Sequence, residues 1–505
     1  MSKSVAMLAF DNTYARLPDR FYARVAPTKV RDPRVVKING ALAEVLGASP
    51  ELLASSVGAS LLVGNEIPSG AEPIALAYAG HQFGGFVPQL GDGRAILLGE
   101  VVGKDGRRRD VQLKGSGRTP FSRGGDGRAA LGPVLREYLV SEAMAALGIP
   151  TTRALAVATT GEPVFRDEVL PGAVLTRVAA SHLRVGTFEL FAARGDREAL
   201  VALTAHALAR HYPDAAGSGN DALALLEQVI EAHANLVARW LGVGFVHGVM
   251  NTDNTAISGE TLDYGPCAFL DAYEPSTRFS SIDHGGRYAF ANQPRVAQWN
   301  MARFAETLLG LLSDEANEDE AIRLAKERLD RFPVLFEAAH LRVLRAKLGL
   351  AREDPGDRAL AHDLLGRLAE NHVDHTLFFR RLCASAALPA VAPTADPAAD
   401  ELILSLFAEP DAFRAWAQTW RRRLATETLD PEARARSMRQ ANPAFIPRNH
   451  RLEEALDAAV RRGDFGPFEI LAEVLARPYD DQPERAHLAD PPGPEQRDYR
   501  TFCGT

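Results

Sequence analysis

Cysteine is scarce in this sequence of 505 residues, which contains only Cys267, Cys383 and Cys503. Three widely spaced cysteines are too few for a disulfide framework or a zinc site, so we expect a reducing compartment. Long hydrophobic runs are also missing, since no stretch approaches the roughly 18 apolar residues of a membrane span. The first residues have no long apolar core and no small-residue cleavage site, so no signal peptide is expected. We therefore expect a cytoplasmic protein without a membrane partner.

Basic residues are spread along the chain, and the short arginine runs 107–109 and 421–423 are interpreted as solvated faces or phosphate contacts. The 57 Lys and Arg residues are outnumbered by 65 Asp and Glu residues, which gives a net charge of −8. Binding to nucleic acid normally needs a clustered basic face, so a nucleic-acid partner is disfavoured. The hydrophobic share of 46% and the charged share of 24% exclude a disordered or fibrous chain. The length is sufficient for two or three packed units.

Short apolar runs alternate with turns in the first half of the chain, which predicts a small α/β lobe. Strands are expected over residues 95–102, 109–115, 154–160 and 172–179. Asp105-Gly106 predicts a tight hairpin turn between the first two strands. A helix is expected over residues 132–147, because Leu135, Leu139, Ala143 and Leu147 recur at four-residue spacing.

From about residue 187 the apolar spacing becomes helical. Helices are expected over residues 221–241, 298–312, 321–348 and 362–386, with more up to about residue 477. The stretch 388–400 is rich in Pro and Ala and is typical of a linker. The predicted organisation is an N-terminal extension (1–75), an N-lobe (76–185), a helical C-lobe (186–387), a C-terminal helical region (388–477) and an extended tail with Cys503 (478–505).

Two glycine-rich segments are candidates for binding phosphate. Gly91 and Gly93 flank one residue and precede Arg94, directly before a predicted strand. Glycines allow backbone N–H groups to approach a phosphate closely, and the arginine adds positive charge. A plain hairpin turn is the alternative interpretation of this motif. The second segment, residues 122–128, contains Asp126 and Gly127.

Lys114 and Glu137 form a possible ion pair. Lys114 ends a predicted apolar strand, and Glu137 follows 23 residues later on the predicted helix, away from its leucine stripe. In protein kinases a strand lysine that holds nucleotide phosphates pairs with a helix glutamate. The alternative is that both side chains lie on the solvated surface.

The segment HGVMNTDN, followed by DYG, has the spacing of a kinase catalytic loop. Asn254 comes seven residues after His247, as in the kinase pattern, and Asp263 takes the place of the metal-binding aspartate. Amide and carboxylate oxygens are ligands that Mg²⁺ or Mn²⁺ prefers. The position of the kinase base is Val249, which cannot accept a proton, and the nearest carboxylate is Asp253. An inactive nucleotide binder remains the alternative.

Arg177 and Arg184 are seven residues apart, which predicts that they lie on one side of a helix. Guanidinium groups suit phosphate oxygens, so both are candidates for binding a nucleotide. Surface ion pairs are the alternative for each arginine taken alone.

Together these motifs resemble the selenoprotein O family, the kinase-like protein adenylyltransferases. The matching stretches are Tyr78–Glu100, Gln112–Leu131, His247–Asn254, the DYGPCAFLD segment and Asn442–His450. The resemblance implies an α+β, protein-kinase-like two-lobe fold with a small α/β N-lobe, a large helical C-lobe and extra C-terminal helices. It further implies that ATP binds in a reversed orientation and that AMP is transferred to Ser, Thr or Tyr hydroxyls of protein substrates.

The resemblance also implies residue roles. Asp253 would accept the proton, Asn254 and Asp263 would hold Mg²⁺ or Mn²⁺, and Glu137 would pair with Lys114. The implied nucleotide contacts are Gly91, Gly93, Arg94, Lys114, Asp126, Gly127, Glu137, Arg177, Arg184 and Asp263. Related bacterial members have been assigned UMP transfer with manganese, which adds UTP as a second candidate nucleotide. The resemblance favours a monomer.

A cysteine near the C-terminus is a redox handle in many members of that family, and in some it pairs with a cysteine of the activation segment. Here Cys267 is the only cysteine in that segment. A Cys267–Cys503 bridge is therefore one interpretation, and a simple core cysteine is the other. At the level of function, an ATP-dependent kinase and a catalytically inactive nucleotide-binding module stay as alternatives to AMP transfer.

Overall fold

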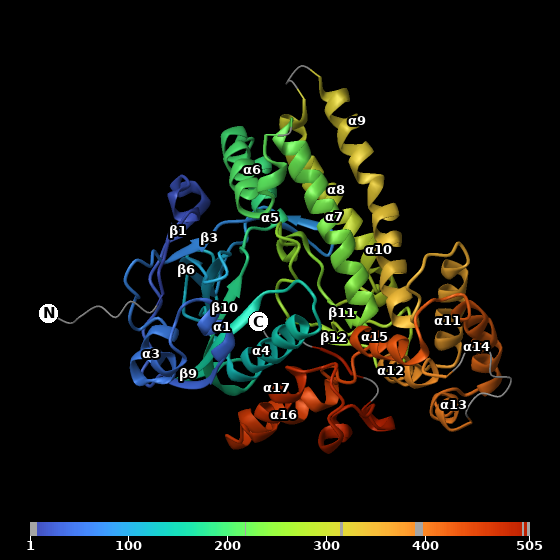
Figure 1. Ribbon diagram of the computed structural model, residues 1–505. Helices are drawn as coiled ribbons and strands as arrows, with labels where there is room; N and C mark the ends of the chain where they lie inside the picture. The colour runs from blue at the N-terminus through green and yellow to red at the C-terminus, as the bar shows by residue number, and fades with distance from the viewer. Residues whose placement is uncertain (1–7, 218, 314–316, 389–396, 497–498, 502–505) are drawn as a thin grey trace.

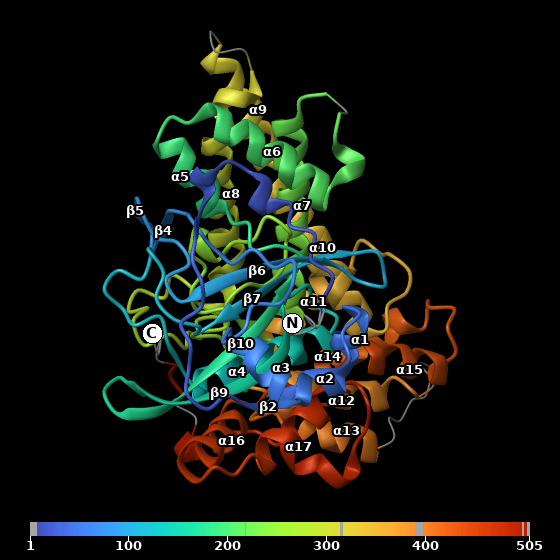
Figure 2. The ribbon, with the colours of Figure 1, turned by 90° about the vertical axis from the view of Figure 1, so that its left-hand side faces the viewer.

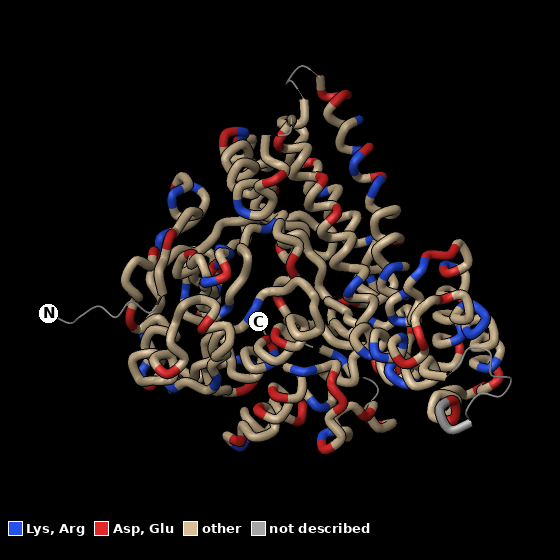
Figure 3. Tube along the Cα trace, in the orientation of Figure 1, with Lys and Arg blue, Asp and Glu red and all other residues tan. Residues whose placement is uncertain are grey.

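The computed structural model describes residues 8–217, 219–313, 317–388, 397–496 and 499–501. It is an α+β protein in which a sheet-containing lobe lies beside a larger region built from helices (Figure 1). Lysines, arginines and carboxylates are interspersed along the trace in both regions (Figure 3). Within the described residues, no helix combines the length and the apolar character that crossing a membrane would need.

The sheet of the first lobe is antiparallel throughout and has eight strands among the described residues. The strand order is β1-β3-β6-β7-β10-β9-β2, and β8 pairs with β10. The bounds are β1 Tyr22–Arg24, β2 Arg34–Ile38, β3 Ile74–Leu76, β6 Ala95–Val102, β7 Arg108–Lys114, β8 Ala129–Ala130, β9 Arg153–Phe165 and β10 Val169–Ala179. The four predicted strands are thus confirmed as parts of β6, β7, β9 and β10. The N-terminal segment contributes strands to both edges of this sheet.

Helices cover both faces of the sheet. On one face, α1 Gly40–Val45, α2 Pro50–Ala54 and α3 Ser56–Leu62 enclose a core that includes Val111, Leu113, Val174 and Val178. On the other face lies α4 Leu131–Ala146, whose Leu135 and Leu139 pack in a core with Leu175. Because side chains alternate along a strand, Lys114 and Arg177 are directed to the α4 face. The helix predicted over 132–147 is confirmed.

The remaining structure is mainly helical. The helices are α5 Val185–Ala193, α6 Arg197–His211, α7 Asp221–Gly242, α8 Gln293–Leu312, α9 Glu318–Leu329, α10 Arg331–Leu348, α11 Asp357–Glu370, α12 His375–Ser385, α13 Pro397–Leu404, α14 Pro410–Leu424, α15 Pro431–Ala441, α16 Asn449–Arg462 and α17 Gly466–Leu475. Two small hairpins accompany them, β4 Gly80–Gln82 with β5 Gly85–Val87, and β11 Phe245–Val246 with β12 Ala268–Phe269. The short 3₁₀ helices are η1 Tyr14–Arg16, η2 Asp19–Phe21, η3 Pro213–Ala215, η4 Thr252–Asn254, η5 Phe290–Asn292, η6 Pro483–Leu488 and η7 Pro494–Gln496.

Two of the long predicted helices are each divided into two. The segment 321–348 breaks between α9 and α10, where Pro333 in the first turn of α10 lacks an N–H group and restricts the residue before it. The segment 362–386 breaks before α12, where the carboxylate of Asp374 caps the new helix by accepting the Leu377 N–H at 2.8 Å. The helix predicted over 221–241 is confirmed as α7.

The C-terminal helices do not form one group. Helices α11–α15 pack around a second core that contains Trp416 and Trp420, at the right of Figure 1. Helices α16 and α17 instead contact α4 of the sheet-containing lobe, below it in Figure 1. Most of the predicted linker, residues 389–396, lies outside the described residues. Near the end of the chain, Thr501 pairs with Ser280, so the tail returns to the side of the DYG segment.

Candidate active site

A cleft of about 1490 Å³ opens where the sheet-containing lobe meets the helical region. Its walls come from β7, α4, β10, the loop that contains η4, and the DYG segment. All twelve predicted site residues lie on its lining: Gly91, Gly93, Arg94, Lys114, Asp126, Gly127, Glu137, Arg177, Arg184, Asp253, Asn254 and Asp263. Residues that are up to 172 positions apart in sequence are therefore brought to one cavity.

Four charged side chains form a compact cluster at the floor of the cleft. Lys114 Nζ donates to Glu137 Oε2 at 2.5 Å and to Asp263 Oδ1 at 2.9 Å. Arg177 Nε donates to Glu137 Oε1 at 2.7 Å, and Arg177 Nη2 lies 3.6 Å from Asp263 Oδ1. Lys114, Glu137 and Arg177 are buried. The predicted Lys114–Glu137 pair is thus present, and it is completed by a second cation and a second carboxylate.

Charge balance explains how this cluster tolerates burial. Burial alone would raise the pKa of both carboxyl groups, but the opposite charges outweigh it. Arg177 and Lys114 hold the pKa of Glu137 below its usual value. Lys114, Arg177 and Arg94 hold the pKa of Asp263 well below its usual value. Both carboxylates are therefore ionised at neutral pH, and they offset the charges of Lys114 and Arg177.

The backbone of Asp263 adopts an unusual conformation. Its φ of 68° lies in the left-handed region, which residues other than glycine rarely occupy. The next residues are fixed from two sides, since the Tyr264 hydroxyl bonds to Thr151 and Arg136 donates to the carbonyls of Tyr264 and Gly265 at 3.0 and 3.1 Å. These contacts hold Asp263 in a conformation that costs free energy, as functional sites often do.

The loop with η4 supplies Asp253 and Asn254. Asn254 Nδ2 donates to the Val249 carbonyl at 3.1 Å, which orients the amide. Gln82 Nε2 donates to Asp253 Oδ2 at 3.2 Å. The other carboxylate oxygen, Asp253 Oδ1, is buried and has no hydrogen-bond partner among the described residues. Asp253 therefore has one oxygen held in place by Gln82 and one buried oxygen without a hydrogen-bond partner among the described residues.

Burial raises the pKa of Asp253 to about 6, although the hydrogen bond from Gln82 and the positive charge of Arg184 act in the opposite direction. A carboxyl group with this pKa is mostly ionised at neutral pH and is a stronger proton acceptor than an exposed aspartate. Val249, at the position of the kinase base, is a buried apolar side chain. Within the segment 247–254, Asp253 is the only residue with a carboxylate.

The prediction that Arg177 and Arg184 share one side of a helix is wrong. Arg177 lies on strand β10, where successive side chains point to opposite faces of the sheet. Arg184 is the residue directly before α5. Both still face the cleft. Arg184 Nη1 donates to the Asp253 carbonyl at 2.8 Å, and its guanidinium lies 4.4 Å from the centre of the Tyr78 ring.

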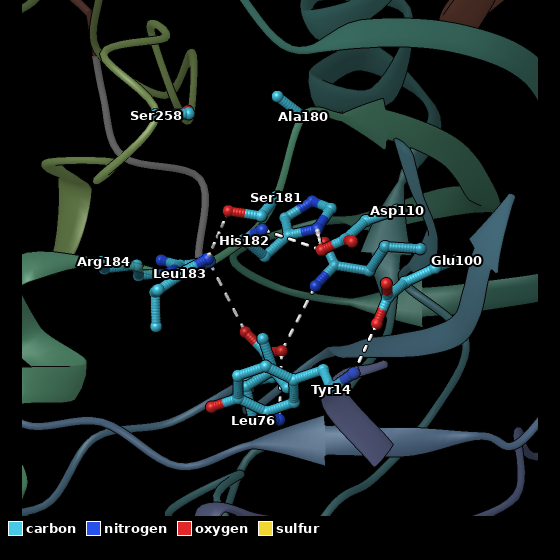
Figure 4. Close-up of polar contacts among 12 residues, drawn as sticks. Tyr14, Leu76, Glu100, Asp110, Ala180, Ser181, His182, Leu183, Arg184 and Ser258 are labelled. Atoms are coloured by element: carbon cyan, nitrogen blue, oxygen red, sulfur yellow. Dashed lines mark hydrogen bonds and ion pairs between the residues drawn. The ribbon is translucent and has the colours of Figure 1, made fainter. Parts of the chain in front are cut away.

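A buried carboxylate anchors the turn that leads from β10 to Arg184 (Figure 4). Asp110 Oδ2 accepts the His182 N–H at 2.8 Å and lies 3.0 Å from His182 Nδ1. Arg210 Nη2 donates to Asp110 Oδ1 at 2.7 Å. Burial would raise the pKa of Asp110, but Arg210 and His182 lower it to about 2. An ionised Asp110 therefore fixes the direction in which the chain enters α5.

The two glycine-rich segments lie against each other and form one wall of the cleft. At Gly91, with φ of 106°, a Cβ atom would lie 2.5 Å from Phe121 Cγ, so the position has no room for a side chain. The Ser122 hydroxyl donates to the Gly93 carbonyl. Asp126 is paired with Arg166, whose Nη1 lies 2.9 Å from Asp126 Oδ2. Asp126 thus orders its loop through Arg166.

Several lining residues were not predicted. Gln82, which bonds Asp253, carries no signal in the sequence, since a lone glutamine before a turn is common. Asp92 lies between the predicted Gly91 and Gly93, and its carboxylate is 3.5 Å from Arg184 Nη2. Thr501, from the far end of the chain, donates to the Pro266 carbonyl at 2.8 Å and lines the cleft. Asp92 was detectable from its position in the motif.

The choice between a Cys267–Cys503 bridge and a simple core cysteine stays open. Cys267 is fully buried, and its Sγ lies 3.5 Å from Arg136 Nη1. Burial raises the pKa of this thiol despite the nearby guanidinium. Cys503 lies outside the described residues.

The chemistry of the donor set fits a divalent cation. Asn254 Oδ1 and Asp263 Oδ2 accept no hydrogen bond among the described residues, although Asn254 Nδ2 and Asp263 Oδ1 are engaged. Both line the same cleft and both are hard oxygen donors. Within the same residues no group of three or more His, Cys, Asp or Glu side chains is arranged to hold a metal alone. A cation here would need further oxygen ligands from a nucleotide or water.

Buried cations, free carboxylate oxygens and glycine-rich turns in one cleft define an enzyme site suited to transfer of a phosphate-containing group. Comparison with known proteins agrees with this class. The family model of protein adenylyltransferase SelO matches residues 4–476, and the chain belongs to this family. The resemblance seen in the sequence is thereby confirmed.

Eight similar curated proteins carry the name protein nucleotidyltransferase YdiU. The relative from Methylorubrum populi is 64% identical and aligns over 99% of this chain and 100% of its own length. Relatives from Rhodopseudomonas palustris and from a Bradyrhizobium species are each 59% identical over 98% of this chain and 99% of their own. The protein is a nucleotidyltransferase enzyme, and it uses a nucleotide and protein substrates.

Proposed function

We propose that this protein transfers AMP from ATP to a Ser, Thr or Tyr hydroxyl of another protein and releases pyrophosphate, within a two-lobe, kinase-like fold. The fold proposal is supported by the Lys114–Glu137 pair, which joins a sheet strand to the helix behind it as in kinases. The position of the kinase base is occupied by Val249. Ordinary phosphate transfer through that position is therefore disfavoured.

The observation that carries the proposal is the burial and incomplete hydrogen bonding of the Asp253 carboxylate. Its carboxylate is buried in the same cleft as the charged cluster, one oxygen is fixed by Gln82, and the other has no partner among the described residues. An aspartate with a pKa of about 6 in this position suits the removal of a proton from an alcohol or phenol during attack.

The proposed reaction balances as one displacement. The acceptor oxygen forms a bond to the α-phosphorus of ATP, the bond from that phosphorus to the bridging oxygen breaks, and pyrophosphate leaves. The hydroxyl proton passes to the Asp253 carboxylate. Arg184, whose guanidinium bonds the Asp253 carbonyl, lies where it can stabilise negative charge on the reacting phosphate.

Asn254 and Asp263 are the residues that would hold a divalent cation, Mg²⁺ or Mn²⁺. When bound, such a cation neutralises phosphate charge and favours departure of pyrophosphate. Lys114 already bonds Asp263 Oδ1 and so orients the carboxylate, which leaves Oδ2 for the ion. Lys114, Arg177, Arg94 and the glycine-rich wall would bind the triphosphate.

The position of the label in ATP tests this proposal. We expect label from the α-phosphate, and none from the γ-phosphate, to appear on protein, with UTP compared in parallel. The Asp263→Ala variant should lose metal-dependent nucleotide binding, whereas Asp253→Ala should keep binding and lose transfer. Transfer of γ-label would identify a kinase, and tight ATP binding without any covalent label would identify an inactive module. Wild-type transfer by Asp253→Ala would exclude Asp253 as the base.

A further inference from the structure

The hairpin of β4 and β5 has an unexpected residue in its turn. Phe83 and Gly84 connect the two strands, and both have positive φ, 51° and 88°. These signs are those of a type I′ turn, in which Asn, Asp or Gly is strongly preferred at the first position. A phenylalanine with positive φ is a rare and strained choice. Stability of the turn therefore does not explain why an aromatic ring is there.

Burial explains it only in part. The Phe83 ring packs edge-on against buried Tyr288, with ring centroids 5.1 Å apart, yet Phe83 stays 39% exposed, and Phe86, on the same hairpin, is 42% exposed. Ile282 is 51% exposed, and both Phe83 and Ile282 line the cleft. We refer to Phe83, Phe86 and Ile282 as the hairpin patch. Figure 2 shows β4 and β5 at the edge of the molecule, where another chain has access.

The hairpin is fastened to the loop that carries Asp253. The His81 N–H donates to Thr252 Oγ1 at 2.7 Å, and the Phe83 N–H donates to Asn251 Oδ1 at 3.1 Å. Gln82, between them, donates to Asp253 itself. Gly80 packs so closely that an added Cβ would lie 2.8 Å from Asp253 Oδ1. The hairpin, with Phe83 and Phe86, is thus held in a fixed position relative to the proposed base.

A cation lies at the tip of the hairpin. The Arg287 guanidinium is beside Gly84, where an added Cβ would be 3.6 Å from Arg287 Cζ, and it lies 4.6 Å from the centre of the Trp299 ring. Its Nε is buried without a hydrogen-bond partner, and no carboxylate pairs with Arg287 among the described residues. A negatively charged group of another molecule could therefore form an ion pair with the Arg287 guanidinium.

We propose that the hairpin patch and Arg287 dock the acceptor segment of the protein substrate. The occupant is an extended segment in which an apolar side chain and an acidic side chain flank the hydroxyl residue. The apolar side chain rests on the hairpin patch, the acidic one pairs with Arg287, and the hydroxyl reaches Asp253. This inference rests on the proposed function, because it takes Asp253 as the proton acceptor.

The Phe83→Asn variant tests the patch without disturbing the turn, since Asn is favoured at this position. The assay follows α-label from ATP into dephosphorylated β-casein, an unfolded acidic protein rich in hydroxyl residues. We expect kcat/KM for casein to fall at least ten-fold, mainly through KM, while the affinity for ATP and the melting temperature are kept. The control is Val334→Asn, which removes a side chain that is 69% exposed on α10 and outside the cleft.

Charge reversal tests the acidic contact. Two synthetic peptides carry the same serine and leucine but differ in one flanking residue, Asp or Lys. We expect the wild type to prefer the Asp peptide and Arg287→Glu to prefer the Lys peptide. Unchanged casein kinetics in Phe83→Asn, an unchanged peptide preference in Arg287→Glu, or self-labelling without labelling of casein or peptides would overturn the inference. Absence of any α-label, on the wild-type protein included, would instead refute the proposed function.

Discussion

Replacing the proposed base should make this protein more stable while it abolishes activity. Asp253 is buried, and only one of its two carboxylate oxygens has a hydrogen-bond partner among the described residues. The ionised form is therefore disfavoured in the folded state, and the pKa rises to about 6 from the model-peptide value of 3.8. Asp253→Asn has nearly the same shape and carries no charge, so it removes this penalty.

The sign and size of the effect follow from proton linkage. Between pH 3.8 and about 6 the folded state binds more protons at Asp253 than the unfolded state, so the free energy of unfolding falls as pH rises through this window. A shift of about two units corresponds to about 3 kcal/mol once both states are ionised. The free energy of unfolding of Asp253→Asn should therefore exceed that of the wild type by about 2 kcal/mol at pH 5 and by about 3 kcal/mol at pH 8.

Urea denaturation of both proteins across pH 5 to 8.5 measures this difference, and Asp411→Asn, whose side chain is 90% exposed, is the matched control that should show no such trend. In parallel, kcat/KM of the wild type for label transfer should rise with pH through about 6 as Asp253 ionises. The reasoning is refuted if the stability difference does not widen with pH, or if Asp253→Asn transfers AMP at the wild-type rate.

Two further variants test neighbouring features. Glu137→Gln removes the negative charge between Lys114 and Arg177 and leaves two buried cations without full charge balance. The free energy of unfolding should therefore drop by about 3 kcal/mol or more, and ATP should bind more weakly. Unchanged urea denaturation and ATP titration curves would contradict this expectation. Gly80→Ala places a methyl group 2.8 Å from Asp253 Oδ1, which is too close, so the Asp253 carboxylate must shift. The rate of transfer should therefore fall at least ten-fold, while the ATP affinity measured by calorimetry is kept. An equal loss of transfer and of ATP affinity would show a general disturbance of the cleft instead.

Local sequence patterns predicted the sheet-containing lobe and its charged pair. The strand that ends at Lys114 and the helix that carries Glu137 each have a clear period, and a salt bridge between them follows once the helix packs on the sheet. The predicted helical relation of Arg177 and Arg184 is wrong because an element boundary lies between them: β10 ends at Ala179, and α5 begins at Val185. Residues 172–179 are predicted as a strand, and because side chains alternate between the two faces of a strand, this prediction already places Arg177 on one face of the sheet.

Contacts between distant segments could not be predicted in the same way. The bond from Gln82 to Asp253 joins residues 171 positions apart, and no period in either segment encodes it. Similarly, Thr501 reaches the DYG segment only because the chain after α17 returns to the cleft. Such contacts depend on how whole elements pack, so they appear only in the folded structure.

Cations are fully paired with carboxylates in one part of the cleft and incompletely paired in another, and this difference suits the proposed reaction. At its floor, Lys114 and Arg177 are matched by Glu137 and Asp263 at hydrogen-bond distance. Beside Asp253 the balance is poorer: Arg184 is buried, its nearest carboxylate oxygen, on Asp92, is 3.5 Å away, and its Nε has no partner among the described residues.

A buried cation with incomplete pairing costs stability unless an anion binds to it. Under the proposed reaction, negative charge increases on the reacting phosphate as Asp253 takes the proton. Arg184, which already bonds the Asp253 backbone at 2.8 Å, is then the donor that gains a partner during attack. Because that contact becomes stronger in the transition state than in the free enzyme, it lowers the barrier to transfer.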